Sequence, residues 1–279
     1  MAEKSPKQDQ FVLGLKDVPV LPASVEAVLR VVNDESASSS DLERVLERDQ
    51  SLTGKTLKVA NSPYYGIRRP AETVSEAVLF IGTRKIRQIA SAMALDPLFK
   101  TDESGLVDGP ALWAHALATA IWTREISGLL GREREHYLYT AALMHDLGIA
   151  VMWQQARDIY RAVLERAKKE RLEHTVAEEQ DLGTTHAAVG AMLCAKWRLH
   201  PGMAQLVGDH HSESCPVTPE QQILRLADNL AGEIGAPEFG WCEPIPLPSG
   251  LLEKMGLRDE DVTAVMERAD DVRAGIALF

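Results

Sequence analysis

The apolar positions of this chain repeat mostly at the spacing of an α-helix. The first clear case carries four aliphatic residues at that spacing: Val25, Val28, Leu29 and Val32. Proline and glycine residues interrupt this helical pattern. Pro63, for example, predicts that the helix before it ends near Asn61, because a proline disfavours helical geometry in the preceding residue. No stretch alternates polar and apolar residues long enough to demand a strand. The pattern therefore predicts an all-α protein.

Longer helical patterns follow in the second half of the chain. We expect helices over 111–130, 133–150, 153–171, 185–198 and 220–233, a helix ending at a histidine pair, and one short and one longer helix over 251–279. Glycine and proline interrupt the pattern over 102–110, and four prolines make 235–250 a connector. These breaks predict a flexible tail (1–17), a first helical subdomain (18–104), a second one (105–235), and a proline-rich connector with C-terminal helices (236–279).

Composition narrows the class of protein. The 279 residues are 45% hydrophobic and 25% charged, as in ordinary globular proteins, and the formal net charge of −11 argues against a general nucleic-acid binder. The three cysteines form no CxxC pair, so neither a disulfide framework nor a zinc ribbon is indicated. No apolar run approaches the roughly 18 residues that span a bilayer. We expect a cytoplasmic protein without a membrane segment.

A set of imidazoles and carboxylates stands out against this background. His145 and Asp146 are adjacent within the apolar stretch AALMHDLGI, and a buried aspartate needs a cation or hydrogen bonds to offset its desolvation. Seven such side chains, flanked by small or apolar residues, fall on predicted helices or at their ends: His115, His145, Asp146, His186, His210, His211 and Asp228. One alternative is a set of unrelated buried polar residues. The other is a shared site for one or two cations, with Asp146 as the bridge.

The residue types limit the metal. Histidine and aspartate without thiolates suit divalent iron, manganese, zinc or nickel. Two such ions sharing a carboxylate could activate a water molecule and hold a phosphoryl group. The three other histidines, His136, His174 and His200, are interpreted as packed or surface residues because they lie beside charged residues or at a helix end.

These residues resemble a known superfamily. The MHDLG stretch is similar to the HD superfamily of metal-dependent phosphohydrolases, whose four-ligand pattern corresponds here to His115, His145, Asp146 and Asp228. The additional His186, His210 and His211 resemble the dinuclear HD-GYP branch, which hydrolyses cyclic di-GMP. The stretches LPASVEAVLRVVND, ERDQSLTGKTLKVANSPYYGIRRP and SEAVLFIGTRKIRQI resemble the HDOD domain, an output domain of bacterial signalling proteins. The resemblance implies an N-terminal helical bundle packed on an HD-like helical core.

Two departures from the HD-GYP pattern bear on activity. The lysine expected shortly after the HD pair is replaced by Ile149, and the residues after His211 contain no Gly-Tyr-Pro. We therefore hypothesise a regulatory signalling protein that binds a protein partner and a divalent metal. The alternative is a phosphohydrolase or phosphodiesterase acting on a nucleotide or cyclic dinucleotide, with His145 and Asp146 holding the catalytic metal.

Basic residues form the remaining candidate site. Arg68, Arg69, Arg84, Lys85 and Arg87 are the main basic spots in an acidic chain. One interpretation is a solvated helix face, and the other is a contact for an anionic ligand or a partner.

Overall fold

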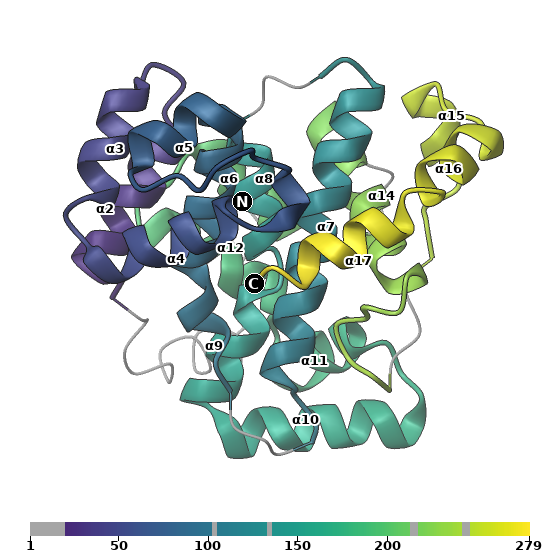
Figure 1. Cartoon of the computed structure of the whole chain (residues 1–279). Helices are drawn as coiled ribbons and strands as arrows, with labels where there is room; N and C mark the ends of the chain where they lie inside the picture. Colours follow the sequence, from purple (N-terminus) through teal and green to yellow (C-terminus); the bar gives the residue numbers. More distant parts are fainter. Residues whose placement is uncertain (1–19, 102–104, 133–135, 213–216, 242–245) are drawn as a thin grey trace.

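The computed structural model describes residues 20–101, 105–132, 136–212, 217–241 and 246–279 (Figure 1). Across these ranges the chain is α-helical with short 3₁₀ segments and contains no strand, as the hydrophobic spacing predicts. The tail predicted over 1–17, and the residues Cys215 and Cys242, lie outside the described ranges. Of the helices that are described, none combines the length and apolar character that crossing a membrane requires.

The first helices form one side of the molecule (purple and blue in Figure 1). They are α2 (Ala23–Val32), α3 (Ser39–Leu46), α4 (Gln50–Ala60), the 3₁₀ turn η1 (Pro63–Tyr65), α5 (Val74–Ile81) and α6 (Thr83–Leu95). Helix α4 ends at Ala60, as Pro63 predicts. The side chain of Asn61 then donates to the carbonyl of Ala71 at 2.9 Å and accepts from the Ala71 amide at 2.7 Å, which closes the loop to α5.

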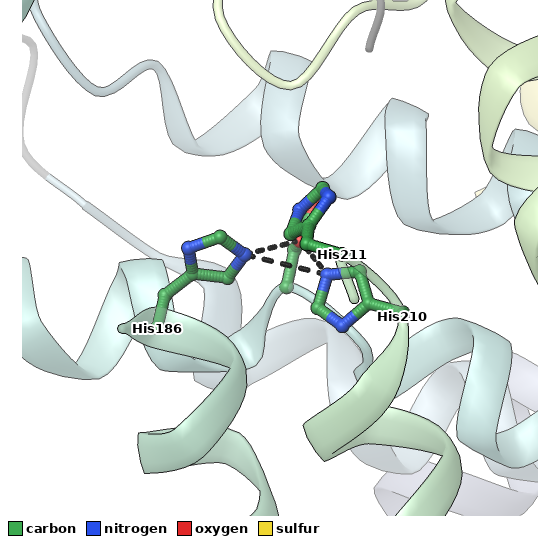
Figure 2. A group of neighbouring side chains, drawn as sticks. His186, His210 and His211 are labelled. Atoms are coloured by element: carbon green, nitrogen blue, oxygen red, sulfur yellow. Dashed lines mark hydrogen bonds and ion pairs between the residues drawn. The ribbon is translucent and has the colours of Figure 1, made fainter. Parts of the chain in front are cut away.

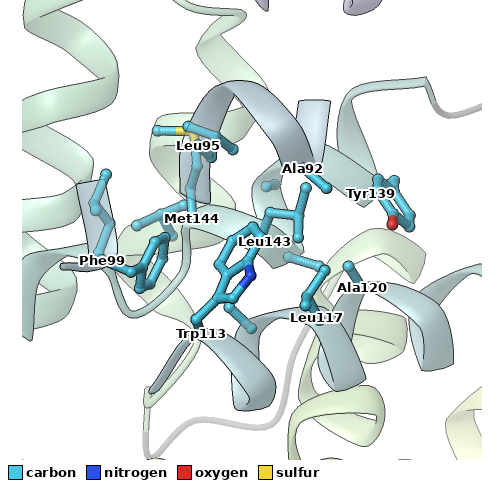
Figure 3. Packing of buried hydrophobic residues seen from close by; sticks show 14 of the residues in the cluster. Ala92, Leu95, Phe99, Trp113, Leu117, Ala120, Tyr139, Leu143 and Met144 are labelled. Carbon is cyan, nitrogen blue, oxygen red and sulfur yellow. The ribbon is translucent and has the colours of Figure 1, made fainter. Parts of the chain in front are cut away.

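The central helices carry the second half of the core. They are α7 (Gly109–Leu129), α8 (His136–Met144), α9 (Leu147–Gln155), α12 (His186–Lys196), α13 (Pro201–Asp209) and α14 (Pro219–Glu233). Helix α7 packs on α8 and α14, and α12 packs on α13 and α9. Figure 3 shows side chains of α6, of the 3₁₀ segment η2 (Asp96–Phe99), of α7 and of α8 in one cluster. The two halves of the chain therefore share a continuous hydrophobic core.

The HD pair lies at a break between two helices. The sequence predicts one helix over 133–150, but α8 ends at Met144 and α9 begins at Leu147. His145 Nδ1 lies 2.6 Å from the carbonyl oxygen of Ala142 and occupies an acceptor that the helix would otherwise use. The backbone of Asp146 then adopts φ −100° and ψ 7°, outside helical geometry. The break turns both side chains inward.

A glycine lets α9 approach its neighbour closely. A Cβ atom at Gly148 would lie 2.0 Å from the backbone oxygen of His186 at the start of α12. Any side chain there would push α12 away from the HD pair. Gly148 therefore sets the distance between His186 and Asp146.

The remaining helices differ in part from the prediction. Helices α10 (Arg157–Glu170) and α11 (His174–Leu182) pack on each other, and the sequence does not predict α11. The C-terminal segment forms three helices instead of two: α15 (Leu251–Met255), α16 (Asp259–Met266) and α17 (Ala269–Ile276). Helix α17 packs on α7 and buries Val272 to 1% exposure. Arg268 lies between α16 and α17 and forms an ion pair with Glu125 of α7. A tertiary contact is therefore made at the point where the predicted longer helix is interrupted.

Candidate metal centre

Asp146 stands at the centre of the histidine cluster. Its side chain is 0% exposed, and the structure gives neither of its carboxylate oxygens a hydrogen-bond partner among the described residues. Burying an ionised carboxylate in this way is costly unless positive charge is close to it. Two groups of imidazoles approach it, one on each oxygen.

The first group surrounds the oxygen Oδ2 of Asp146. His145 Nε2 lies 3.1 Å from this oxygen and His115 Nε2 lies 3.3 Å from it. The carboxylate of Asp228, from α14, places Oδ1 3.1 Å from His115 Nε2 and 3.7 Å from His145 Nε2. The two imidazole nitrogens are 3.2 Å apart. Four side chains from α7, the α8–α9 break and α14 therefore face a common point.

The second group surrounds the other oxygen, Oδ1. His186 Nε2 and His210 Nε2 each lie 3.3 Å from it and 3.3 Å from one another. Figure 2 shows His186, His210 and His211 pointing toward one another from the start of α12 and the end of α13. One ligand atom of each of these histidines and of Asp146 lies within 4.8 Å of all the others. Asp146 thus presents one oxygen to each group.

Hydrogen bonds at Nδ1 set the orientation of four rings. Three of them face backbone carbonyls: His115 with Ala236 at 2.8 Å, His145 with Ala142 at 2.6 Å, and His210 with Val207 at 2.6 Å. A carbonyl oxygen only accepts, so Nδ1 carries the hydrogen, and Nε2 of the neutral ring carries the lone pair. The fourth ring, His186, has Nδ1 2.9 Å from a carboxylate oxygen of Glu178. Such outer partners are typical of metal-ligating histidines.

These atoms fit a bound cation. Nitrogen lone pairs and ionised oxygens repel one another at such short distances unless positive charge lies between them. The donors are imidazoles and carboxylates, which suit borderline divalent metals. The residues that are present therefore fit a divalent metal ion.

His211 differs from the other four rings. Its Nδ1 lies 3.3 Å from Nη1 of Arg225, and a guanidinium can only donate. In the neutral ring Nε2 then carries the hydrogen and has no lone pair for a metal. Arg225 also donates to the carbonyl of His210 at 3.2 Å and lies 3.6 Å from Asp228. His211 could bind a metal through Nε2 only if its hydrogen moved to Nδ1, and the hydrogen bond from Arg225 would then be lost.

The electrostatics of the centre keep its carboxylates ionised. Burial alone would raise the pKa of Asp146, but His145, His186 and His210 outweigh burial and hold that pKa well below its usual value. Burial likewise opposes ionisation of Asp228, and His115 and His145 outweigh it to lower the pKa. Burial lowers the pKa of His210, and the attraction of Asp146 does not compensate. Burial opposes protonation of His115 and His145, but Asp146 and Asp228 outweigh it and raise the pKa of both rings, so a metal that binds there would displace protons.

Sequence reasoning missed several residues of the centre. His174 and Glu178 lie on α11, four positions apart on one face, and both side chains are 0% exposed. The His174 ring stacks on His186 at 5.1 Å, and its Nε2 lies 3.0 Å from Glu238. His174 is packed, as expected, but within the metal-capable cluster. Recognising α11 from the spacing of His174, Ala177 and Glu178 could have revealed this face.

The other two histidines interpreted as packed or surface residues can be placed only in part. His200 is exposed at the start of α13, where its Nδ1 accepts from the Gly202 amide at 3.2 Å, and this confirms the interpretation for His200. The side chain of His136 lies outside the described residues.

The basic residues separate into two kinds. Arg68, Arg69 and Lys85 are exposed, and Arg69 pairs with Glu76 at 2.8 Å. Arg87 is 7% exposed, so the solvated-face interpretation is wrong for this residue. Arg84 is half-buried. The three basic residues of α6 therefore differ in exposure: Lys85 is exposed, Arg84 is half-buried and Arg87 is buried.

Comparisons with solved structures show that other proteins share this fold. An HDOD domain protein of unknown function from Geobacter sulfurreducens has a similar structure, with a TM-score of 0.83 and 24% identity over 98% of this chain and 97% of that one. A proposed signal transduction protein from Marinobacter aquaeolei VT8 gives a TM-score of 0.78 at 20% identity, covering 98% of this chain and 65% of that one. A proposed metal-dependent phosphohydrolase from Shewanella amazonensis SB2B gives 0.62 at 19% identity, covering 98% and 100%.

Sequence comparison gives the family. An uncharacterised protein of Treponema pallidum (strain Nichols) is 22% identical over 208 residues, which are 74% of this chain but only 40% of that protein's length. The family model of the HDOD domain matches residues 18–213, well over half of the chain. This chain belongs to the HDOD domain family.

Proposed function

We propose that this chain is a regulatory output module of bacterial signal transduction that binds a protein partner and holds a divalent metal in its HD-like core. Membership of the HDOD family supports this, together with the structural likeness to a proposed signal transduction protein. The observation that carries the proposal is the burial of the candidate ligands. His145, Asp146 and His186 are 0% exposed, and His115 is 2% exposed.

The metal would be held by the residues around Asp146. His115, His145 and Asp228 would hold one ion, and His186 and His210 would hold a second, with Asp146 shared. His211 would join the second group only after its contact with Arg225 changes. Iron, manganese, zinc and nickel suit these donors. Bound in this way, the metal would stabilise the junction of α7, α9, α12 and α14, because binding to a site absent in the unfolded chain contributes to folding.

A regulatory role is favoured over turnover by the surroundings of the centre. Catalysis needs an exchangeable ligand position and a pocket for the substrate. Ile149, at the position where a phosphate-reading lysine is expected, is 0% exposed and belongs to the core. The stretch after His211 lacks Gly-Tyr-Pro in the sequence, and its residues 213–216 lie outside the described ranges.

The partner would meet the N-terminal helices, which we treat as the subdomain 18–104 packed on the core 105–235. Leu79 on α5 is 79% exposed, and Arg68 is exposed in the loop before that helix. Exposed apolar and basic side chains in this subdomain suit a protein surface with an apolar centre and an acidic rim.

One set of measurements tests the proposal. Purified protein should contain a stoichiometric amount of a divalent metal. It should not cleave bis(p-nitrophenyl) phosphate in the presence of iron, manganese, zinc or nickel. It should also retain a signalling protein in a pull-down, and the Leu79→Asp variant should not retain it. His145→Ala should lose the metal. Absence of metal in the wild type would contradict the proposed metal binding. Retention of the same partners by Leu79→Asp would contradict the proposed partner surface on the N-terminal helices.

A metal-dependent phosphohydrolase acting on a nucleotide or cyclic dinucleotide is the second candidate. The observation favouring it is the position of Asp146 between two imidazole groups, as in two-metal sites. Such a metal pair lowers the pKa of a bound water and holds the phosphoryl group. Turnover of bis(p-nitrophenyl) phosphate that Asp146→Ala abolishes would establish this candidate in place of the regulatory one.

A further inference from the structure

A buried arginine contacts both groups of side chains around Asp146. Arg225, on α14, is 4% exposed. Its Nη1 donates to the backbone carbonyl of His210 at 3.2 Å, and its Nη2 donates to the carbonyl of Pro246 at 3.1 Å. These carbonyls belong to separate segments of the chain, the end of α13 and the proline-rich connector, so together they hold the guanidinium in one place. Arg225 is therefore a fixed positive charge beside the candidate metal ligands.

Arg225 meets the first group through the carboxylate of Asp228. Its Nη1 lies 3.6 Å from Oδ2 of Asp228, while Oδ1 of the same carboxylate lies 3.1 Å from His115 Nε2. The two oxygens of Asp228 thus face different partners. The contact with Arg225 leaves Oδ1 directed at the first group, where it can still act as a metal ligand.

At the second group, two adjacent histidines have opposite hydrogen-bond roles. His210 Nδ1 donates to the carbonyl of Val207 at 2.6 Å, so its Nε2 keeps a lone pair, 3.3 Å from Oδ1 of Asp146. His211 Nδ1 instead accepts from Nη1 of Arg225 at 3.3 Å. To bind a metal through Nδ1, His211 would have to exchange Arg225 for the ion. To bind through Nε2, it would have to lose the hydrogen that this nitrogen carries. Arg225 therefore opposes ligation by either nitrogen of His211.

The His211 ring has a packing role that does not need its lone pairs. Its centroid lies 4.0 Å from that of His210 and 4.9 Å from that of His186, in an edge-to-face contact with the latter (Figure 2). Contacts of this kind depend on the shape and faces of the rings. A phenyl ring at position 211 would keep this packing and remove both nitrogens.

We infer that Arg225 is a positioning residue that sets how many divalent ions the centre holds, because it keeps His211 out of the ligand set. The inference rests on the proposed metal binding and adds to it the order in which ions bind. The first group offers four ligand side chains, His115, His145, Asp146 and Asp228, and takes the first ion. The second group offers only His186, His210 and the other oxygen of Asp146, and takes a second ion more weakly.

Calorimetric titration of the metal-free full chain with Zn²⁺ tests this inference. Arg225→Met removes the donors and the charge but keeps an unbranched side chain. His211→Phe is made in the wild type and in Arg225→Met, so that the two substitutions form a double-mutant cycle. Arg87→Met is the matched control, because Arg87 is also a buried arginine that donates to backbone carbonyls, those of Val31 and Val32. Urea unfolding verifies that each variant is folded.

We expect the wild type to bind one Zn²⁺ tightly and a second at least about tenfold more weakly. Arg225→Met should bind the second ion about tenfold more tightly, because ligation by His211 no longer breaks a charge-assisted hydrogen bond. His211→Phe should remove this gain in Arg225→Met, but change the affinity of the second ion less than about twofold in the wild type. Arg87→Met should bind both ions like the wild type.

The tautomer of His211 gives a readout that a loss of stability alone would not move. Nitrogen-15 NMR of the metal-free protein should show the hydrogen of the wild-type ring on Nε2. In Arg225→Met the donor to Nδ1 is gone, and the proportion of the ring with its hydrogen on Nδ1 should increase.

Three results would overturn the inference while leaving the proposed metal binding intact. These are two ions bound with equal affinity by the wild type, a loss of the second ion in His211→Phe as large as in His210→Phe, or equal affinities for the second ion in Arg225→Met and Arg87→Met. A wild type that binds no Zn²⁺ would contradict the proposed metal binding itself, and this inference with it.

Discussion

Two polar clusters of this protein differ in chemistry. Around Asp146, imidazole nitrogens and carboxylate oxygens point toward one another at 3.1–3.3 Å, and the buried carboxylates need protons or a metal ion to balance their charge. Around Thr123, guanidinium and hydroxyl groups line a cavity between α6, α7 and α8, and all are able to donate. A cluster of acceptors calls for protons or a cation, and a cluster of donors calls for acceptors. The comparison shows that the ligand of a polar cluster is indicated by whether its groups donate or accept hydrogen bonds. The burial of the cluster is less informative.

Replacing the shared carboxylate should have the largest effect on this comparison. Asp146→Asn exchanges one acceptor oxygen for a donating amide and removes the charge between the two imidazole groups. We expect metal affinity to fall by more than the roughly 10–100-fold that loss of an outer partner costs. Dialysis followed by elemental analysis measures it. Asp158→Asn, at an exposed position on α10, serves as the control, and equal metal content in both variants would refute a centre built on Asp146.

Arg87 tests the structural role of the arginines around the cavity between α6, α7 and α8. Arg87→Met leaves the carbonyls of Val31, Val32 and Asp34 without their donor. We expect the free energy of unfolding to fall by about 3 kcal/mol, as for a buried hydrogen-bond network. Lys85→Met, at an exposed position on the same helix, should change it by less than about 0.5 kcal/mol. Urea denaturation distinguishes the two, and similar values would show that Arg87 is not a bracing residue.

Glu178 sharpens the description of the metal centre. Its carboxylate lies 2.9 Å from His186 Nδ1 and accepts from the Tyr160 hydroxyl at 2.6 Å. Glu178→Gln should weaken metal binding about 10–100-fold, because the carboxylate orients the ring and raises its basicity. Competition with a chromophoric chelator gives the affinity. Glu179→Gln, on the exposed face of the same helix, should bind metal like the wild type, and a loss there would contradict the specific role of Glu178.

The pH dependence of stability should reverse when metal is removed. Burial lowers the pKa of His186, but Glu178 and Asp146 outweigh it and raise that pKa to about 9. In the metal-free protein this group contributes stability that is present below the unfolded pKa of about 6.5 and is lost as pH rises through 9. We expect a loss of order 2 kcal/mol. Metal-loaded protein should instead gain stability over this range, since ligation requires neutral imidazoles. Thermal unfolding between pH 6 and 9 measures both, and parallel curves would argue against metal at this site.

Local patterns in the sequence were sufficient for most of the fold. Apolar spacing predicts α2 and α14, and Pro63 marks the end of α4, because these features act within a few residues of one another. The break at His145–Asp146 was not predicted. It depends on a side chain that competes for the carbonyl of Ala142, and the apolar pattern continues through it unchanged.

The candidate centre shows the same division. The sequence alone supplied the residue types, and the unusual placement of imidazoles and carboxylates on apolar faces indicated a common site. Tertiary structure decided the rest: that Asp146 faces both groups, that His174 and Glu178 join them, and that Arg225 engages His211. The ligand atoms of His115 and Asp228 meet although they are more than a hundred positions apart, and helical periodicity carries no information about such distances. Only the packing of α7, α9, α12 and α14 sets them.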